Sequence, residues 1–401
     1  MPVVSVDSQH EAVETDAASA LTSTLAWSRA RDYHGHTKHD ALASPLLWAL
    51  CRWGKWPRLI AIQAVMRSPV NLRSLLQVPR TCNPKGLALF VHAYLDRHAV
   101  SGTHSDLDEA QRLLQRLMTM SSPGAWHGLA WGYPYPWQDL GFFAPTNTPN
   151  AVVTAFVCEA FLHAHATTGR REFLDTVARS IPFFLGDLRV LKDTPDELCL
   201  SYMPVDMRMR VMDVSILIGS VLSGYEKQSG DDRHHDTACR LVNYVVRRQT
   251  KYAAWFYTDP PADSPIRHDN YHTGFILDAV WRHMQATGDR SHEEAYQRGL
   301  RYYHDHLFNA DGSPRWMSDR DYPHDIHGAA QGIITFARHM EAYPGTAERI
   351  MAWTLKRMYH PIGRFYYQEM PRYRKKFTLM RWCNAWMARA LAHYLRCRVG
   401  V

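Results

Sequence analysis

The chain has 401 residues, of which 46% are apolar, so it is long enough to bury a large hydrophobic core. Lysine and arginine outnumber aspartate and glutamate by 46 to 39, and the basic residues are scattered along the sequence. A nucleic-acid-binding protein would need a continuous basic face, so the charge pattern argues against that class.

The seven cysteines are far apart and form no Cys-x-x-Cys pair, which argues against both a disulfide framework and a cysteine zinc site. Residues 1–20 are polar and lack the apolar segment of a signal peptide. No apolar run is long enough to span a bilayer. We therefore expect a cytoplasmic protein with no membrane span.

In chain order, residues 1–40 show little hydrophobic periodicity and are expected to form a mobile lead-in. Residues 43–66 are predicted to be an amphipathic helix that is interrupted near Gly54 and Pro57.

A repeat follows, with small-residue turns about every 60 residues, at Thr168-Gly169, Ser229-Gly230, Thr287-Gly288 and Pro344-Gly345. Two kinds of helix alternate with these turns. The first kind is predicted over 84–95, 149–165, 214–226, 272–285, 327–340 and 381–395. The second kind is predicted over 107–120, 171–188, 232–248, 291–308 and 347–359.

The two kinds of helix differ in polarity. Helices of the first kind are apolar on nearly every side, which is typical of buried helices, whereas those of the second kind carry charges on one face. An inner ring inside an outer ring is the (α/α)6 toroid. We therefore predict an all-α fold in which residues 41–401 form a single domain, with the helix before Met66 completing the outer ring.

The loops that lead into the inner helices are long and rich in aromatic residues, so they are expected to form one chemically active rim. Asp269 with His272, and Asp325 with His327, stand at two inner-helix starts. The aspartates also suit helix caps, which is the alternative explanation for them. Capping does not require the histidines, however, and buried carboxylates beside imidazoles have the shifted pKa values that acid–base catalysis needs.

Further candidates lie on the rim loops. Asp206 ends a polar and aromatic loop and is a reserve catalytic carboxylate. The candidates for substrate binding are aromatic residues that could stack on sugars and one arginine that could hold a carboxylate: Trp131, Tyr133, Trp137, Tyr271, Tyr322, Trp382 and Arg381. The sequence has no HExxH motif, phosphate-binding loop or dinucleotide fingerprint, so no metal or cofactor is predicted.

Several motifs together resemble a known bacterial family. They are Trp131-Gly-Tyr-Pro-Tyr-Pro-Trp-Gln138, Thr148-Pro149 with Thr154-Ala-Phe156, Ser201-Tyr202 with Asp206, Asp269-Asn-Tyr-His-Thr-Gly274, Tyr322-Pro323 with Asp325-Ile-His327, and Arg381-Trp382 with Trp386-Met387. The chain is similar over about residues 80–396 to VpsJ-like polysaccharide biosynthesis proteins, within the six-hairpin glycosidase-like group. The resemblance implies an (α/α)6 fold and work on an exopolysaccharide or capsular glycan, and it assigns no reaction or catalytic residue.

The sequence thus favours a carbohydrate-active enzyme that acts on an acidic or amino-sugar glycan or its precursor. Hydrolysis would use Asp269 and Asp325 as acid and base, with Asp206 in reserve. A lyase or an epimerase would use His272 or His327 as base, a tyrosine as acid, and Arg381 to neutralise a uronate.

Other function classes stay open. The main alternative is a noncatalytic glycan-binding or assembly subunit that contacts other polysaccharide synthesis proteins. A cyclase of isoprenoids or peptides is disfavoured, because the acidic DxDD or DDxxD clusters and the Cys-Cys-His zinc set of such toroids are absent from the sequence.

Overall fold

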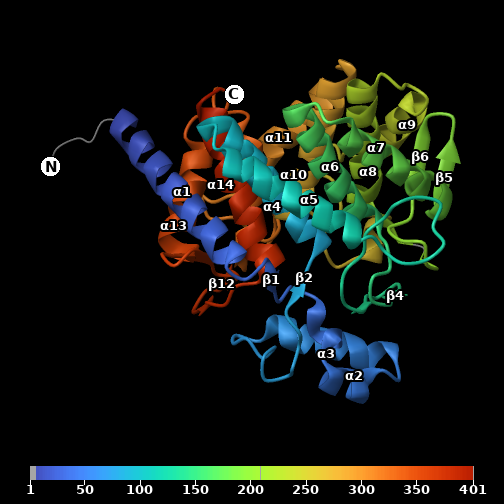
Figure 1. The fold of residues 1–401 in the computed structure, drawn as a ribbon, viewed down its shortest axis with the longest axis horizontal. Coiled ribbons are helices and arrows are strands. Elements are labelled where there is room, and N and C mark those ends of the chain that lie inside the picture. The colour runs from blue at the N-terminus through green and yellow to red at the C-terminus, as the bar shows by residue number, and fades with distance from the viewer. Residues whose placement is uncertain (1–5, 208, 401) are drawn as a thin grey trace.

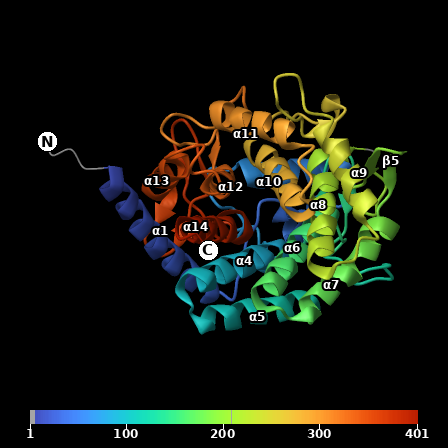
Figure 2. The ribbon, with the colours of Figure 1, turned by 90° about the horizontal axis from the view of Figure 1, so that it is seen from above.

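A computed structural model describes residues 6–207 and 209–400, and within them helices form two concentric layers (Figures 1 and 2). The inner layer consists of α4 (Pro84–Ser101), α6 (Ala151–Thr168), α8 (Met212–Ser229), α10 (Asn270–Thr287), α12 (Ile326–Ala337) and α14 (Trp386–Arg398). Each inner helix contacts the next, and α14 contacts α4, so the ring closes. This confirms the predicted (α/α)6 toroid.

The outer layer consists of α5 (His104–Thr119), α7 (Arg171–Pro182), α9 (His235–Val246), α11 (Glu293–Leu307), α13 (Thr346–Met358) and α1 (Val6–Arg29). One π-helical turn, Phe183–Asp187, extends α7, and another, Met380–Ala385, leads into α14. The inner helices are buried almost all round, whereas the outer helices bury one apolar face, as their sequence patterns predict.

Glycine ends four of the inner helices, α4, α6, α8 and α10, so the turns that follow them are tight. The residues Gly102, Gly169, Gly230 and Gly288 have φ angles of 67°, 70°, 73° and 75°. Each donates its backbone N–H to a carbonyl in the last turn of its helix, at His98, His165, Glu226 and Met284. Side chains disfavour this left-handed backbone, so the predicted turns at Gly169, Gly230 and Gly288 mark real helix ends, whereas Gly345 precedes α13 as its N-cap and α12 ends earlier, at Ala337.

The outer ring closes differently from our expectation. The helix α1 packs against α13 and α14, in the place that we assigned to the helix before Met66. It lies within the segment 1–40, which we expected to be a mobile lead-in, and residues 1–5 of that segment are outside the described residues. Ala17, Leu21 and Leu25 lie on one face and are buried. This stripe was missed because a small alanine and two leucines stand among many polar residues.

The segment predicted as one helix over 43–66 forms two, α2 (Pro45–Cys51) and α3 (Lys55–Arg67), and the chain breaks at Gly54 as expected. These helices lie outside the rings and protrude from the body (Figure 1). A short ladder between β1 (His34–Gly35) and β2 (Thr81–Cys82) joins this lobe to the barrel. The lobe has a small apolar core of its own, formed by Ala41, Leu42, Cys51, Ile62 and Val65.

The remaining strands are short and belong to the loops that lead from outer to inner helices. They are β3 (Trp137–Gln138), β4 (Phe143–Ala144), β5 (Val190–Thr194), β6 (Glu197–Leu200), β7 (Arg210–Val211), β8 (Thr258–Asp259), β9 (His324–Asp325), β10 (Tyr359–His360), β11 (Arg364–Phe365), β12 (Gln368–Glu369) and β13 (Arg374–Lys375). Short 3-10 turns occur at Asp40–Ala43 and Pro261–Asp263. Pairing is antiparallel throughout, and β9, β12 and β13 form one sheet beside the start of α12. These ladders fix the rim loops that carry the candidate site.

Candidate active site at the barrel rim

The clearest candidate for acid–base chemistry is a pair formed by the buried Asp269 and the partly buried His272 at the start of α10. The Nδ1 atom of His272 lies 2.8 Å from Oδ2 of Asp269. On its other side, Nε2 of His272 lies 3.9 Å from Oδ2 of Asp213, in the first turn of α8. A carboxylate that holds one imidazole nitrogen fixes the tautomer and leaves the other nitrogen available as a base.

Asp213 completes this cluster, although it was not among the predicted site residues. Burial raises the pKa of its carboxyl group, while His272 and Lys85 act in the opposite direction. Its Oδ1 atom has no hydrogen-bond partner among the described residues. The carboxyl group therefore has an unused acceptor that faces a narrow cleft lined also by Asp269, His272 and Tyr257.

His327 lies in an aromatic cage. Its ring stacks on Tyr271 with a centroid distance of 4.5 Å and an interplanar angle of 7°, and it also contacts Trp382 and Trp386. Neither of its ring nitrogens has a hydrogen-bond partner among the described residues. Burial, followed by the charges of Lys85, Arg381 and Lys38, holds its pKa well below the ordinary value, so the ring is neutral at pH 7.

Both carboxylate oxygens of Asp325 already accept hydrogen bonds from the protein. Its Oδ1 accepts hydrogen bonds from the backbone N–H of His327 at 3.0 Å and from Nε1 of Trp382 at 2.8 Å. Its Oδ2 accepts one from Nε2 of Gln368 at 2.7 Å. The capping interpretation is therefore right for Asp325, but Asp269 makes no side-chain cap and binds His272 instead.

Buried cations lie between these groups. The Nζ atom of Lys38 is 4.0 Å from the centroid of a Trp382 ring, and Nζ of Lys85 is 3.8 Å from that of Phe156. Burial lowers the pKa of Lys38 to about 8 and that of Lys85 well below its ordinary value. Arg381 donates from Nε to Thr37 at 3.1 Å. The predicted Arg381 therefore lies in the same pit as two lysines that sequence reasoning missed.

The two lysines differ in whether the sequence alone could have indicated that they are buried. Lys85 interrupts the apolar start of α4, directly after Pro84, and a charge on a fully buried helix is a signal that could have been used. Lys38 lies in the segment interpreted as a lead-in, and nothing local shows that it enters the barrel.

Part of the aromatic rim loop also reaches the pit. The Tyr133 ring lies 5.3 Å from the guanidinium of Arg381, and Trp137 stacks on His39 at a centroid distance of 5.6 Å. Trp131 does not reach it, because its side chain is fully buried and its indole N–H donates to the carbonyl of Leu117. It is a core residue.

Two other predicted residues lie elsewhere. Asp206 is 87% exposed and forms an ion pair with Arg189 on the surface, so it does not join the buried carboxylates. Tyr322 packs on His324 at a centroid distance of 4.1 Å, in a separate cleft that Glu369 also lines. Both positions depend on how the long loops fold back, which helix periodicity does not encode.

The residues that meet in the pit are thus Asp213, Asp269, His272, Asp325 and His327, with Lys38, Lys85 and Arg381 as counter-charges. Within residues 6–207 and 209–400, no group of three or more His, Cys, Asp or Glu side chains is arranged to hold a metal ion. The arrangement can transfer a proton through an imidazole and can neutralise a negative charge beside it.

Comparison with known proteins supports the architecture. No family model and no curated protein sequence matches the chain. Among solved structures, the cellobiose 2-epimerase of Bacillus thermoamylovorans B4167 is similar with a TM-score of 0.64 and 12% identity, over 80% of this chain and 90% of that one. An unsaturated glucuronyl hydrolase specific for heparin has a TM-score of 0.62 and 12% identity, over 95% and 96% of the two chains.

A GH76 α-mannanase of Bacteroides thetaiotaomicron has a TM-score of 0.58 and 13% identity, over 78% of this chain and 86% of that one. These structures are carbohydrate-processing enzymes of the six-hairpin glycosidase-like type. At such low identity the likeness establishes the fold, and a fold hosts many reactions. The chain is therefore an (α/α)6 toroid of the kind that sugar epimerases and glycosidases share.

Proposed function

We propose that this protein is a carbohydrate-active enzyme that moves a proton on a sugar, as an epimerase or a lyase does. The observation that carries the proposal is the Asp269–His272 pair, whose 2.8 Å contact leaves Nε2 of His272 free to act as a base. The neutral His327 contacts the same Tyr271 ring as His272 does. Because the Tyr271 ring contacts both imidazoles, we assign the proton transfer to His272 alone, while His327 packs against Tyr271 and helps to hold it in place.

Hydrolysis by Asp269 and Asp325 fits the geometry less well. A general acid must be protonated before it reacts, which requires a carboxyl group with a raised pKa. Asp325 accepts hydrogen bonds on both oxygens, so neither oxygen is left to deliver a proton to a substrate. The carboxylate of Asp269 already contacts the Nδ1 atom of His272. A positioning role suits both carboxylates better than proton donation.

A second candidate function is hydrolysis with Asp213 as the general acid. It is favoured by one observation, namely that burial raises the pKa of the Asp213 carboxyl group beside a narrow cleft. The product of the reaction separates this candidate from the first, because hydrolysis adds water and leaves the carbon-bound hydrogens in place.

The buried cations point to an acidic substrate. Lys38 and Arg381 stand beside the aromatic cage and could bind a uronate carboxylate or stabilise the enolate formed when a carbon loses a proton. The similarity of the motifs to VpsJ-like proteins supports a role in making bacterial exopolysaccharide or capsule. We propose an acidic or amino-sugar glycan, or its precursor, as the substrate.

Incubation with uronate-containing and neutral oligosaccharides in deuterium oxide tests this function. Mass spectrometry should show deuterium at one carbon of the product of an epimerase, or an unsaturated product of a lyase, and His272→Asn should reduce either conversion by about a hundredfold or more. The matched control is His104→Asn, which changes an exposed histidine at the start of α5. Water addition without deuterium at carbon would favour hydrolysis, and saturable binding without conversion would favour a noncatalytic subunit.

A further inference from the structure

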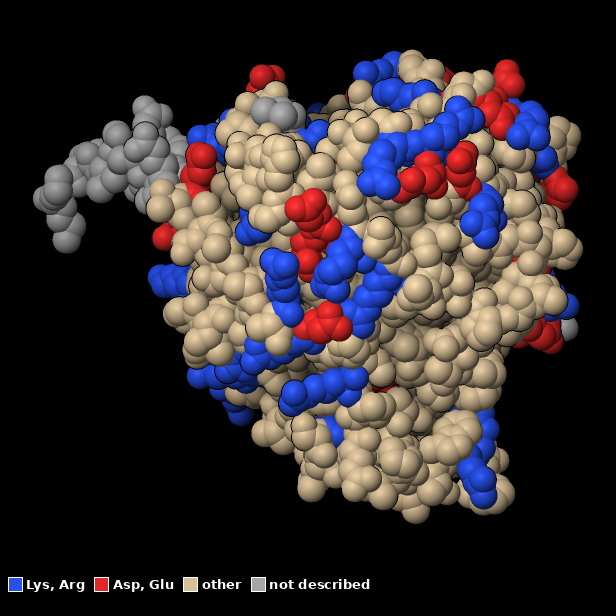
Figure 3. Space-filling view, in the orientation of Figure 1, with Lys and Arg blue, Asp and Glu red and all other residues tan. Residues whose placement is uncertain are grey.

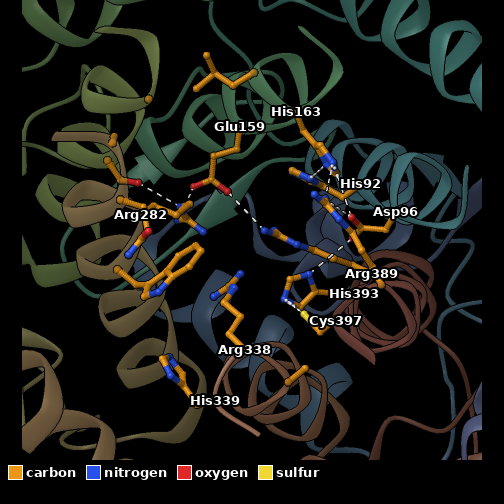
Figure 4. Close-up of a pocket in the computed structure, with 18 of the residues that line it drawn as sticks. His92, Asp96, Glu159, His163, Arg282, Arg338, His339, Arg389, His393 and Cys397 are labelled. Carbon is orange, nitrogen blue, oxygen red and sulfur yellow. Dashed lines mark hydrogen bonds and ion pairs between the residues drawn. The ribbon is translucent and has the colours of Figure 1, made fainter. Parts of the chain in front are cut away.

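We propose a second binding site, for an anionic sugar, at the end of the barrel opposite to the Asp269–His272 pair. A cavity of about 780 Å³ opens there among the C-terminal halves of the inner helices (Figure 4). On α10 its wall includes Arg282, which is ten residues beyond His272, or about 15 Å along the helix. The volume is in the range of small-molecule sites, and the proposal does not depend on the reaction at the rim.

Most arginines of the cavity already have a carboxylate partner. Arg282 donates to Glu159 at 2.7 Å, Arg338 donates to Asp278 at 2.7 Å, and Arg396 donates to Asp96 at 2.8 Å. These pairs come from different inner helices and hold the wall of the cavity together. The paired arginines offer fixed N–H donors to a ligand, but the carboxylates beside them cancel most of their positive charge.

Arg389 differs from these arginines. Its side chain is 8% exposed, and its closest carboxylate oxygen is Oε2 of Glu159 at 3.7 Å, beyond hydrogen-bond distance, while Oε1 of the same carboxylate accepts from Arg282. Its guanidinium makes no hydrogen bond to any other described residue. Burial lowers the pKa of Arg389 to about 10, so the group is still charged at pH 7. A buried guanidinium with unused donors is costly unless an acceptor completes it.

Helix geometry alone does not explain this charge. Cations are favourable in the last turn of a helix, where backbone carbonyls are unpaired. Arg389 lies instead in the middle of the continuous helix formed by Met380–Ala385 and α14, where neither helix end stabilises its charge. Figure 4 shows Arg282, Arg338 and Arg389 entering the cavity from three helices. Together they can surround one phosphate or carboxylate group.

Neighbouring imidazoles suit the rest of a sugar. Nδ1 of His92 lies 2.9 Å from Nδ1 of His163, and Nε2 of His92 has no hydrogen-bond partner among the described residues. Burial holds the pKa of both rings below the ordinary value, to about 4 for His163, so both are neutral at pH 7. Neutral imidazoles both donate to and accept from hydroxyl groups. The ligand class is therefore a sugar that carries a phosphate or a carboxylate.

Calorimetric titration of the full chain with glucose 1-phosphate, glucuronate, inorganic phosphate and glucose tests the site. We expect at least one anionic sugar to bind, and Arg389→Met to weaken it about tenfold or more. Arg389→Lys should keep part of the affinity. Arg398→Met is the matched control, since Arg398 belongs to the same helix and pairs at the surface with Glu14.

The melting temperature distinguishes loss of the site from loss of the fold. Removing an unsatisfied buried cation should leave it unchanged or raise it, so a folded Arg389→Met variant that binds normally would overturn the proposal. Absence of binding by every anionic probe, or equal binding of glucose, would overturn it as well.

A different observation supports a second proposal, which concerns the lobe formed by α2 and α3. We infer that this lobe docks on an anionic lipid membrane. Half of the large apolar side chains that are exposed in the described chain lie in the lobe and in the loop that follows it, between residues 46 and 75. They are Leu46, Leu50, Trp53, Trp56, Ile60, Val70 and Leu75. Leu50 and Trp53 are 77% and 76% exposed. An apolar surface of this kind on a protruding element marks an interaction site.

The positive charge of the lobe indicates that its partner is anionic. No aspartate or glutamate occurs between Asp40 and Asp96, whereas Arg52, Lys55, Arg58 and Arg67 are interleaved with the exposed tryptophans and leucines. Figure 3 shows basic side chains among uncharged ones at the lower end of the molecule, where Figure 1 places the lobe. Tryptophan beside lysine and arginine is typical of elements that lie in the interface of an anionic bilayer. No helix among the described residues is long and apolar enough to cross a membrane.

Co-sedimentation with phosphatidylcholine vesicles, with and without phosphatidylglycerol, tests this docking. The chain should bind the anionic vesicles, and added salt should weaken the binding. The double variants Trp53→Ser/Trp56→Ser and Arg52→Glu/Lys55→Glu should each reduce binding about tenfold or more. Val190→Ser, at an exposed apolar residue of β5 outside the lobe, should not.

Equal binding of all variants, or no binding to anionic vesicles, would overturn this second proposal. Concentration-dependent self-association that the tryptophan variant abolishes would identify a second copy of the chain as the occupant instead.

Discussion

The two ends of the barrel are built from the same inner helices but have opposite chemistry. At the rim, where the inner helices begin, carboxylates and aromatic rings are packed tightly and leave only a narrow cleft beside Asp213, Asp269 and His272. At the other end, where these helices finish, arginines and histidines surround a cavity of about 780 Å³. The rim therefore has the reactive groups, whereas the far end has the open space.

Helix direction explains most of this contrast. The N-terminal ends of helices carry partial positive charge and favour aspartate, and their C-terminal ends favour cations. Because the inner helices run in parallel, one mouth collects Asp213, Asp269 and Asp325 and the other collects arginine. The exceptions are informative: Lys38 and Lys85 lie at the rim, where the dipole disfavours them, and Arg389 lies in mid-helix, where no helix end stabilises it. We attribute function to them for that reason.

The largest effect should come from replacing Asp269 at the rim, and Asp278, in the middle of the same helix, provides the matched comparison. Asp269→Asn removes the carboxylate that orients His272 and should reduce turnover by about a hundredfold to ten-thousandfold. Asp278→Asn changes a buried aspartate on the same helix that binds Gln331, Thr335 and Arg338. Steady-state rates should be nearly unchanged in that variant. Similar losses in both would show that the rim is not the catalytic end.

An intermediate effect is expected from the buried lysine at the rim. Folding lowers the pKa of Lys38 from 10.5 to about 8, so the charged form destabilises the folded state below pH 8, and this cost fades as the pH rises to 10.5. Lys38→Met should therefore raise the free energy of unfolding at pH 7 by up to about 3 kcal/mol. Urea unfolding at pH 7 and pH 10 measures the difference, which should shrink at the higher pH.

The Lys38→Met variant also tests whether the charge of Lys38 contributes to activity. If the charge of Lys38 serves the substrate, activity should fall in the wild type as the pH rises through about 8, and Lys38→Met should be poorly active although more stable. A variant that is neither more stable nor less active would show that the lysine charge plays no part at the rim.

The smallest effect should come from the turns between the two layers. Gly230→Ala places a side chain at φ 73°, where no atom lies close enough to clash, so only backbone strain is added. We expect a loss of about 1 kcal/mol, measured by urea unfolding, with unchanged activity. Gly274→Ala is the contrasting variant, because its Cβ would lie 2.3 Å from Gln331 between α10 and α12. It should cost more than Gly230→Ala, and equal costs would mean that the inner ring packs loosely.

Much of the fold was predictable because its signals are local. The helices from Pro84 onward follow from apolar periodicity and from glycines at their ends, and both depend on neighbouring residues only. The prediction was wrong for α1, where the buried face consists of a few small and apolar residues in a polar segment. The helix that closes the ring was therefore assigned to α2 and α3, which form the lobe instead.

The candidate site was predictable only in part. Asp269, His272, Asp325 and His327 stand at helix starts, so their convergence follows from the toroid itself. Asp206, Trp131 and Tyr322 were selected from loops, and the loops carry them to the surface, to the core and to a separate cleft. Loop paths depend on contacts between distant segments, such as the pairing of β12 with β9, and composition does not reveal these.

The sequence by itself determined the two layers of helices and the rim on which carboxylates and imidazoles gather, because helix periodicity and capping act over a few residues. Only the tertiary structure decided that Asp269 binds His272 while Asp325 is saturated, and that Lys38 enters the pit from far along the chain. It also decided that the open cavity lies at the opposite end. Hydrogen-bond partners and burial are set by the packing of segments that are remote in sequence, and both control the protonation of a buried group.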